Sequence, residues 1–249
     1  MLCTGPLMYR EVTQQSFFYQ QWKANGWGAP YSAFASCHAA DCPTGADAIQ
    51  TFGGYNTELA AKGLTWYPLT SVPTANQIDF VTFPEIFSYW SVGLTSVAIG
   101  DEELVLNATY SKQLNAVPAA IFNHASQGRG LPLSADGYAR LVELANATAI
   151  PLDSALLQMP PNNGKQPFFE FDCSTVQELP TISYVFNGSP KAWTVEPDAY
   201  VVQAGKSCIL DVRVLGHGEW ELGNFGDNFL RGKYIVFDYD LLRVGLAEL

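Results

Sequence analysis

The chain has 249 residues, of which 48% are hydrophobic and only 15% are charged. A chain of this length and composition can bury a substantial core, which excludes an intrinsically disordered protein. Asp and Glu outnumber Lys and Arg by 24 to 13, and the formal net charge of −11 argues against nucleic acid or an acidic membrane surface as a partner. No apolar run approaches the roughly 20 residues that a membrane-spanning helix needs.

Two short helices are expected. The first lies within Gln14–Lys23, where Phe18 and Trp22 are four residues apart and can share one face. The second begins after Ser134, whose side chain can cap the first helical turn. Apolar residues then recur at i, i+3, i+4 and i+7 across residues 138–145, which predicts a helix with one buried face.

Short runs rich in β-branched and aromatic residues fill most of the remaining sequence, separated by Gly, Pro and Asn. The run Tyr89–Leu94 has the alternating pattern of a half-buried antiparallel strand. Long loops are expected at Pro73–Pro84 and Pro151–Pro167. The pattern indicates an all-β sandwich or barrel with a few short helices. The predicted strands are Ala48–Phe52, Leu64–Leu69, Tyr89–Ile99, Glu103–Leu106, Val117–Phe122, Thr181–Phe186, Cys208–Val214, Lys233–Phe237 and Val244–Ala247.

The motifs of metal and nucleotide sites are missing from the sequence. The five cysteines form no C-x-x-C pair, and the three histidines never fall at H-E-x-x-H spacing, so we expect no metal site. Gly205-Lys206-Ser207 resembles the end of a phosphate-binding loop, but Tyr200 stands where the first glycine of that loop is required. We therefore expect no cofactor.

Three N-x-[ST] sequons, at Asn107, Asn146 and Asn187, are candidate glycosylation sites, although three barely exceed the number expected by chance. The 15 prolines, 21 glycines and 13% aromatic residues also suit an extracellular β-rich protein. The opening residues, however, lack the basic region and apolar stretch of a signal peptide. This inconsistency suggests that an N-terminal part is missing.

Three stretches, in this order, resemble the pepsin-like aspartic peptidases. Phe52–Leu69 is similar to that family's "FGGVD … G.L.W.PL" hairpin, and Tyr89–Gly100 to its "YW.V.L.SV.IG" strand. Gly226–Ala247 resembles its C-terminal "GD.FLR.YY.VFD … VGLA". The resemblance covers about residues 14–249 and implies an acid-protease fold, essentially the C-terminal lobe. Residues 1–64 would be a remnant of the first lobe with the interlobe segment, and residues 65–249 the second lobe.

The resemblance also implies a disulfide between Cys173 and Cys208, which are 35 residues apart. Closing a loop of this length should contribute roughly 3 to 4 kcal/mol by the chain-entropy argument. The alternative is that both are buried free thiols. Cys37 and Cys42 could form a small local bridge, which would leave Cys3 without a partner.

The family's second catalytic loop, "I.DSGTSL…LP", aligns without a gap with residues 121–132 of this chain. Asn123 then occupies the position of the catalytic aspartate, His124 that of the Thr or Ser hydroxyl, and Ala125 that of the glycine. Ser126 alone keeps its chemistry. Family members activate water with two carboxylates that share one proton, and an amide can act neither as base nor as acid.

The first lobe's catalytic triplet is also missing, because the chain contains neither DTG nor DSG. A rival base–nucleophile pair of His124 and Ser126 has no third group and no oxyanion-hole motif beside it. We expect Asp227 to form structural hydrogen bonds rather than to replace a catalyst. Asp238 and Asp240 are expected to form a surface turn.

The sequence therefore predicts a truncated, catalytically inactive homologue of the acid endopeptidases, with retained binding of a peptide or protein partner in its cleft. The alternative is part of a genuine aspartic endopeptidase whose N-terminal lobe is missing from this sequence. By family and composition the protein would be secreted or vacuolar. Surface normally covered by a first lobe would then be exposed, which predicts self-association, and a homodimer of second lobes is a further possibility.

Overall fold

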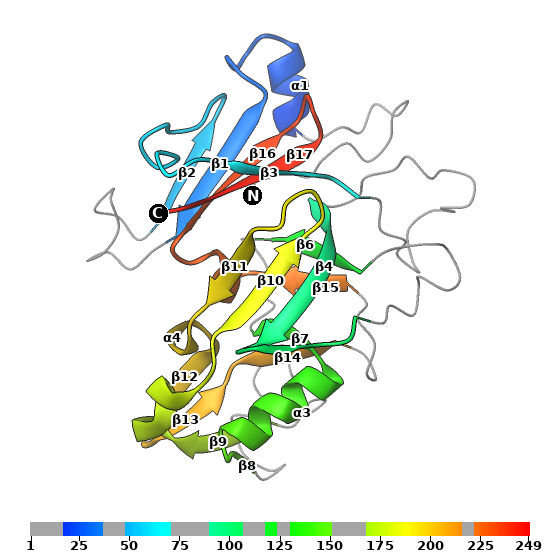
Figure 1. Cartoon of the computed structure of the whole chain (residues 1–249). Helices are drawn as coiled ribbons and strands as arrows, with labels where there is room; N and C mark the ends of the chain where they lie inside the picture. The colour runs from blue at the N-terminus through cyan, green and yellow to red at the C-terminus, as the bar shows by residue number, and fades with distance from the viewer. Residues whose placement is uncertain are drawn as a thin grey trace.

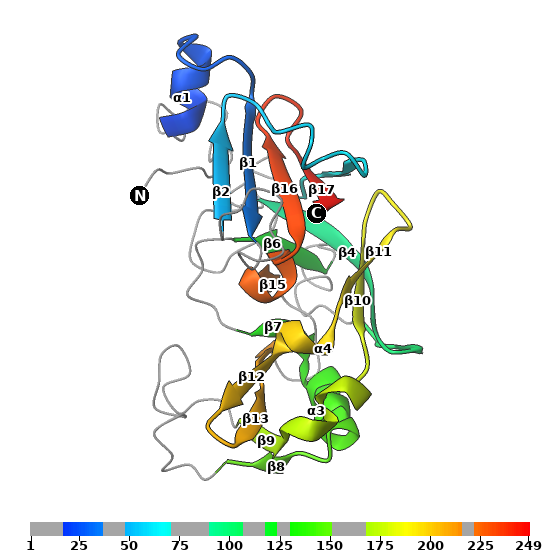
Figure 2. The ribbon, with the colours of Figure 1, turned by 90° about the vertical axis from the view of Figure 1, so that its left-hand side faces the viewer.

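The structure is a computed structural model that describes residues 17–36, 48–70, 90–106, 118–123, 130–150, 168–215 and 222–249. Strands dominate it, and the helices are few and short (Figures 1 and 2). The prediction of an all-β fold with a few short helices is confirmed. None of the helices in these ranges is long and apolar enough to cross a membrane. The expected loops at Pro73–Pro84 and Pro151–Pro167 lie outside the described residues.

The first sheet has five antiparallel strands and lies at one end of the molecule with helix α1 (Phe17–Lys23) (Figure 1). Two of its strands come from before residue 64 and three from after it. The division of the chain into two lobes at residue 64 stays a prediction. In spatial order the strands are β2 (Ala48–Phe52), β1 (Tyr31–Ser36), β16 (Lys233–Asp238), β17 (Arg243–Glu248) and β3 (Thr65–Pro68).

Side chains alternate along each strand, so the first sheet presents apolar residues on both of its faces. On one face Phe237 and Leu246 join the main core, to which Phe18 of α1 also belongs. Phe18 is 1% exposed and stacks on Tyr239 with 4.3 Å between the ring centroids. The opposite face carries a smaller cluster that Leu59 covers from the turn-rich segment before β3.

The second sheet runs through the centre of the molecule (Figure 1). Its strand order is β11 (Ala192–Val195), β10 (Ile182–Phe186), β4 (Ser91–Ile99), β6 (Ala119–Phe122) and β15 (Leu222–Phe225), and β5 (Glu102–Glu103) also pairs with β4.

The prediction that residues 89–94 form a half-buried strand is wrong where the structure describes them. Residues 90–94 are all buried, and burial alternates only from Thr95 onward. Trp90 explains the difference, since its ring packs 4.8 Å from those of Phe237 and Tyr239. Trp90, directly before β4, thus packs against β16 of the first sheet, and both faces of this end of β4 are covered.

A smaller third sheet and a two-stranded pair complete the fold at the end opposite the first sheet (Figure 2). The third sheet has the order β12 (Val201–Ala204), β13 (Ser207–Leu210), β9 (Phe169–Asp172) and β8 (Thr148–Ala149), and β7 (Leu131–Ser134) pairs with β14 (Val212–Leu215). The remaining short helices are α4 (Pro197–Tyr200), α5 (Asp227–Leu230) and the 3-10 helix η2 (Cys173–Glu178).

Helix α3 (Ala135–Leu144) confirms the second predicted helix. Ser134 caps it as expected, because its Oγ accepts the Gly137 N–H at 3.2 Å. Tyr138 and Leu141 are buried against the core. Helix α1 likewise forms at the C-terminal end of its predicted range, from Phe17 to Lys23.

The expected surface turn at Asp238 and Asp240 needs a correction. Asp240 is exposed, but Asp238 is fully buried, because β16 lies between β1 and β17 in the first sheet. The Asp238 carboxylate accepts hydrogen bonds from the backbone N–H groups of Asp240 and Leu241, both at 3.0 Å, and from Arg243 Nε at 2.8 Å. A buried carboxylate therefore closes the β16–β17 hairpin from the inside.

Candidate functional site

The candidate site lies where two parallel strand pairs meet. β6 pairs in parallel with β15, and β7 pairs in parallel with β14, whereas every other strand pair of the described residues is antiparallel. β6 and β7 are consecutive strands joined through residues 124–129. The segment that follows Asn123 therefore begins beside one parallel pair and ends beside the other.

Asn123 comes directly after β6 and is partly buried. Its backbone N–H donates to the carbonyl oxygen of Phe225 at 3.0 Å, which extends the β6–β15 pairing by one residue. The N–H of Phe122 donates to the carbonyl oxygen of Trp90 at 2.9 Å. Asn123 is thus held at the end of a strand that is anchored on both sides.

The other end of the segment is held as tightly. Leu131 donates its N–H to the carbonyl oxygen of Asp211 at 2.9 Å. Gly130 has a φ of 99°, and a Cβ placed there would lie 2.6 Å from the backbone nitrogen of Arg213. Only glycine fits this approach of two backbones. His124, Ala125 and Ser126 lie outside the described residues, so the His124–Ser126 pair stays an untested alternative.

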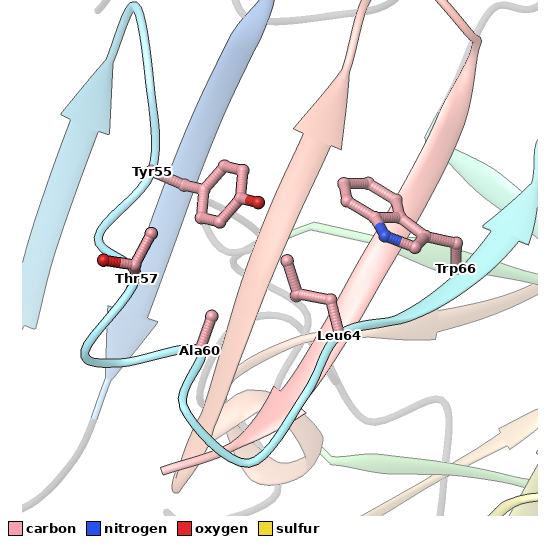
Figure 3. Close-up of a pocket in the computed structure, with 5 residues that line it drawn as sticks. All are labelled: Tyr55, Thr57, Ala60, Leu64 and Trp66. Atoms are coloured by element: carbon pink, nitrogen blue, oxygen red, sulfur yellow. The ribbon is translucent and has the colours of Figure 1, made fainter.

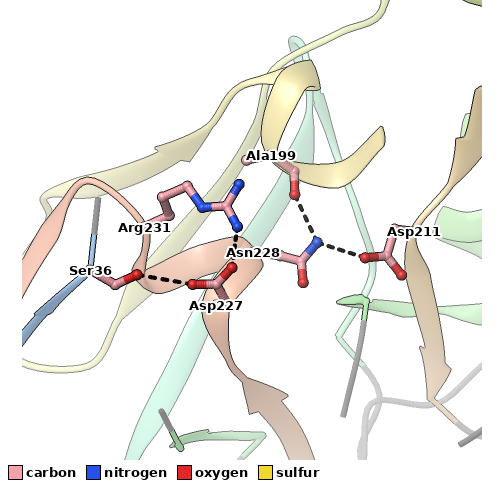
Figure 4. A network of polar contacts seen from close by, with 6 residues as sticks. All are labelled: Ser36, Ala199, Asp211, Asp227, Asn228 and Arg231. Carbon is pink, nitrogen blue, oxygen red and sulfur yellow. Dashed lines mark hydrogen bonds and ion pairs between the residues drawn. The ribbon is translucent and has the colours of Figure 1, made fainter. Parts of the chain in front are cut away.

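Helix α5 connects the candidate site to the rest of the molecule through polar contacts (Figure 4). Asp227 accepts a hydrogen bond from Ser36 Oγ at 3.0 Å and forms an ion pair with Arg231. The Asn228 amide donates to the carbonyl oxygen of Ala199 at 2.7 Å and to Asp211 Oδ2 at 3.0 Å. Asp227 therefore has the structural hydrogen bonds expected of it.

The role of Asn228 was not predicted from the sequence. The hydrogen bond from Asn228 to Asp211 links α5, which follows β15, to the start of β14. The backbone carbonyl of Asp211 in turn accepts the N–H of Leu131. One chain of contacts thus connects the two ends of the segment after Asn123. The only sequence signal was a second polar residue, after Asp227, in "GDNFLR", and nothing in that pattern identifies its partners.

An aromatic core lies beneath these strands. Phe122 of β6 and Phe225 of β15 pack with Phe186 and Phe229, with ring centroids 4.9 to 6.0 Å apart. The hydroxyl of Tyr184 donates to the carbonyl oxygen of Pro132 at 2.8 Å, and complete burial raises the pKa of this hydroxyl well above its ordinary value. The site therefore rests on a rigid and largely apolar base.

A separate hollow of about 300 Å³ lies on the outer face of the first sheet (Figure 3). Tyr55 and Trp66 stand on opposite sides of it, with Leu64 between them, and Thr57 and Ala60 complete the lining. No carboxylate and no histidine lines the hollow. Its residues could supply apolar contacts and hydroxyl groups, but they offer no acid–base pair for hydrolysis.

The cysteine pair and two of the sequons are also placed. Cys173 and Cys208 form a disulfide, with Cα atoms 5.0 Å apart, that joins the start of η2 to β13. Asn146 and Asn187 are both exposed. The third sequon and the other three cysteines, at Asn107, Cys3, Cys37 and Cys42, lie outside the described residues. Among the residues that the structure describes, no group of three His, Cys, Asp or Glu side chains could hold a metal ion.

Comparisons with known proteins show the family to which the chain belongs. The chain is 42% identical over 241 residues to the aspartic protease-like protein pynH of Aspergillus niger, covering 94% of the chain and 57% of that protein. It is 39% identical over 256 residues to the aspartic protease-like protein pytH of Aspergillus terreus, covering 95% of the chain and 59% of that protein.

A probable secreted aspartic protease of Arthroderma benhamiae is 41% identical over 211 residues, covering 82% of the chain and 48% of that protein. The chain thus spans about half to three fifths of the length of these relatives. The family model for eukaryotic aspartyl proteases matches residues 11–249. The chain belongs to the eukaryotic aspartyl protease family, the pepsin-like aspartic peptidases.

Proposed function

We propose that this chain is a non-catalytic member of the family that binds an extended peptide without cleaving it. The observation that carries the proposal is Asn123. The resemblance of residues 121–132 to the family's catalytic loop assigns Asn123 to the position of the second catalytic aspartate. The proposal is supported by the place of Asn123 at the end of β6, where its backbone N–H donates to Phe225 of β15.

The chemistry follows from the difference between an amide and a carboxylic acid. Hydrolysis in this family needs one carboxylate to accept a proton from water and a second carboxyl group to donate one. The amide of Asn123 does neither in the accessible pH range. A first lobe supplied by another segment would still leave the site with a single carboxylate at this dyad.

The first test is a digestion of a protein substrate by the purified chain at about pH 4, where the dyad of this family works. We expect the substrate to stay intact. Cleavage that a statine-type inhibitor blocks, and that persists through further purification, would refute the proposal. Retained binding is tested by fluorescence anisotropy with a labelled extended peptide taken from the digestion substrate, for which we expect saturable binding. A flat titration would refute the binding half of the proposal.

The name of the Arthroderma benhamiae relative, a probable secreted aspartic protease, favours a second candidate, in which this chain is one portion of an active aspartic endopeptidase. A hybrid protein separates the two. The part of the Aspergillus niger relative that precedes its matched region is joined to this chain, with Asn123 or with Asn123→Asp. Our proposal predicts cleavage only with Asn123→Asp, whereas the alternative predicts cleavage with Asn123 as well. Asn187→Asp, an exposed site with the same change of charge, is the matched control.

We also propose that the protein is exported and that it self-associates through the first sheet. The name of the Arthroderma benhamiae relative supports export. Within the described residues β2 and β3 are the outer strands of the first sheet, and outer strands can pair with another chain at contact range. The net charge of −11 opposes association only weakly, because physiological salt screens charges beyond about 8 Å. Light scattering over a concentration series should show growth in mass, and a constant monomer mass would refute self-association.

A further inference from the structure

The turn after α3 displays the sequon Asn146-Ala147-Thr148 on the surface. Asn146 has a φ of 47°, and its N–H donates to the carbonyl oxygen of Glu143 at 3.0 Å. Ala147 donates to the carbonyl oxygen of Val142, also at 3.0 Å, and is itself partly buried. This is the hydrogen-bonded end of a helix, in which the residue after the last turn takes the left-handed conformation.

The two side chains that define the sequon, those of Asn146 and Thr148, are both exposed. Among the described residues neither side chain forms a hydrogen bond. The neighbours at 143, 144 and 149 are exposed as well, and Leu144 keeps 43% of its surface in water. Within the part of the chain that the structure describes, a bulky group on Asn146 can therefore be accommodated without moving a packed side chain.

The sequon Asn187-Gly188-Ser189 differs although Asn187 is also exposed. The hydroxyl of Ser189 forms a hydrogen bond inside the β10–β11 turn. Ser189 Oγ accepts the N–H of Lys191 at 3.2 Å. The next residue is Pro190, whose ring confines Ser189 to extended backbone conformations, in the unfolded chain as well as in the folded one.

We propose that Asn146 is N-glycosylated and that Asn187 stays largely unmodified. In this reaction the side-chain nitrogen of Asn146 forms a bond to the anomeric carbon of a sugar donated by a lipid-diphosphate-linked oligosaccharide. The bond from that carbon to the diphosphate breaks, the diphosphate leaves with the electron pair, and the amide nitrogen loses one proton. The proposal rests on the export proposed above, because such donors are used in the secretory pathway.

The test produces the full chain behind a cleavable secretion leader in a yeast host, so that export is supplied and does not depend on the native source. The secreted protein is treated with an amidase that releases N-glycans in ¹⁸O-water, which converts each glycosylated Asn to labelled Asp. Peptide mass spectrometry then measures occupancy at residues 146 and 187. We expect most molecules to carry the label at Asn146 and few at Asn187.

Two variants test why the two sequons should differ in occupancy. Thr148→Ala removes the hydroxyl but keeps the backbone conformation of Asn146, and should abolish the label at that position. Pro190→Ala frees Ser189, and should raise occupancy at Asn187. The proposal is overturned if Asn146 is unlabelled while a second secreted glycoprotein from the same culture is labelled, or if Asn187 is the more occupied site. Absence of the protein from the medium of its own source would instead refute export.

Discussion

Replacing Asp238 tests how far one buried carboxylate stabilises the sheet that joins the two ends of the chain. Asp238 is 0% exposed and accepts three hydrogen bonds, two from backbone N–H groups and one from Arg243. Arg243 also lies over the ring of Trp66, 4.0 Å from its centroid. The carboxylate thus connects the β16–β17 turn, β17 and β3.

The expected cost follows from these contacts. Breaking a buried ion pair by removing one partner costs about 3 to 5 kcal/mol. The Arg243 side chain keeps 29% of its surface exposed and can find water, so we place Asp238→Ala near the lower end, at about 3 kcal/mol. Asp238→Asn keeps an oxygen for the two backbone N–H groups, and should cost about 1 to 2 kcal/mol.

Urea unfolding followed by tryptophan fluorescence measures these costs. Asp240→Ala is the matched control, because Asp240 is exposed in the same turn and its loss should change the free energy of unfolding by less than about 0.5 kcal/mol. A double-mutant cycle with Arg243→Ala isolates the pair, for which we expect a coupling of about 1 to 3 kcal/mol. The reasoning is wrong if Asp238→Ala costs no more than Asp240→Ala.

Three further predictions concern the disulfide, alkaline stability and the turn at Gly130. Reducing the disulfide, or replacing Cys173 and its partner by Ser, should lower the free energy of unfolding by roughly 3 to 4 kcal/mol in urea titrations, and an unchanged midpoint would contradict this. Burial raises the pKa values of Tyr184 and Tyr200 above the ordinary 10.0, so the folded protein keeps these phenols neutral at a pH where the unfolded chain ionises them. Their contribution to stability is therefore complete below about pH 10 and declines above it, and melting temperatures measured across that range should fall less steeply for Tyr200→Phe. Gly130→Ala forces a Cβ to within 2.6 Å of a backbone nitrogen and should lower the free energy of unfolding by about 3 kcal/mol or more. Gly205→Ala is the control: it has φ 67° and nothing within 4 Å, and should lower it by about 1 kcal/mol. Equal melting temperatures for the two variants would refute the close approach.

Sequence reasoning succeeded where the signal is local. Ser134 and the apolar spacing after it predict α3 because capping and helix formation depend on residues within four positions. The prediction of Ala48–Phe52 matches β2 at both ends, and that of Lys233–Phe237 falls one residue short of β16. The predicted run Cys208–Val214, in contrast, is divided at Asp211 into β13 and β14, which belong to different sheets.

Strand β1 shows why other elements were missed. Its sequence, YSAFAS, is made mostly of small residues and lacks the β-branched side chains that identify a strand. It is a strand because β16 lies beside it, with Ser32 opposite Phe237, some 200 positions along the chain. Small side chains such as Ala33 and Ala35 are suited to a central strand whose two faces are both covered.

For the candidate site, the sequence identified the residues: Asn123, which the family resemblance predicts to stand at the position of a catalytic aspartate, a cysteine pair 35 residues apart, and the sequons. The tertiary structure decided their surroundings. Only the fold brings β15 alongside β6, buries Asp238, and directs Asn228 to Asp211. The physical reason is that burial and parallel pairing depend on partners far away in the chain, whereas a motif records only the identity and order of its own residues.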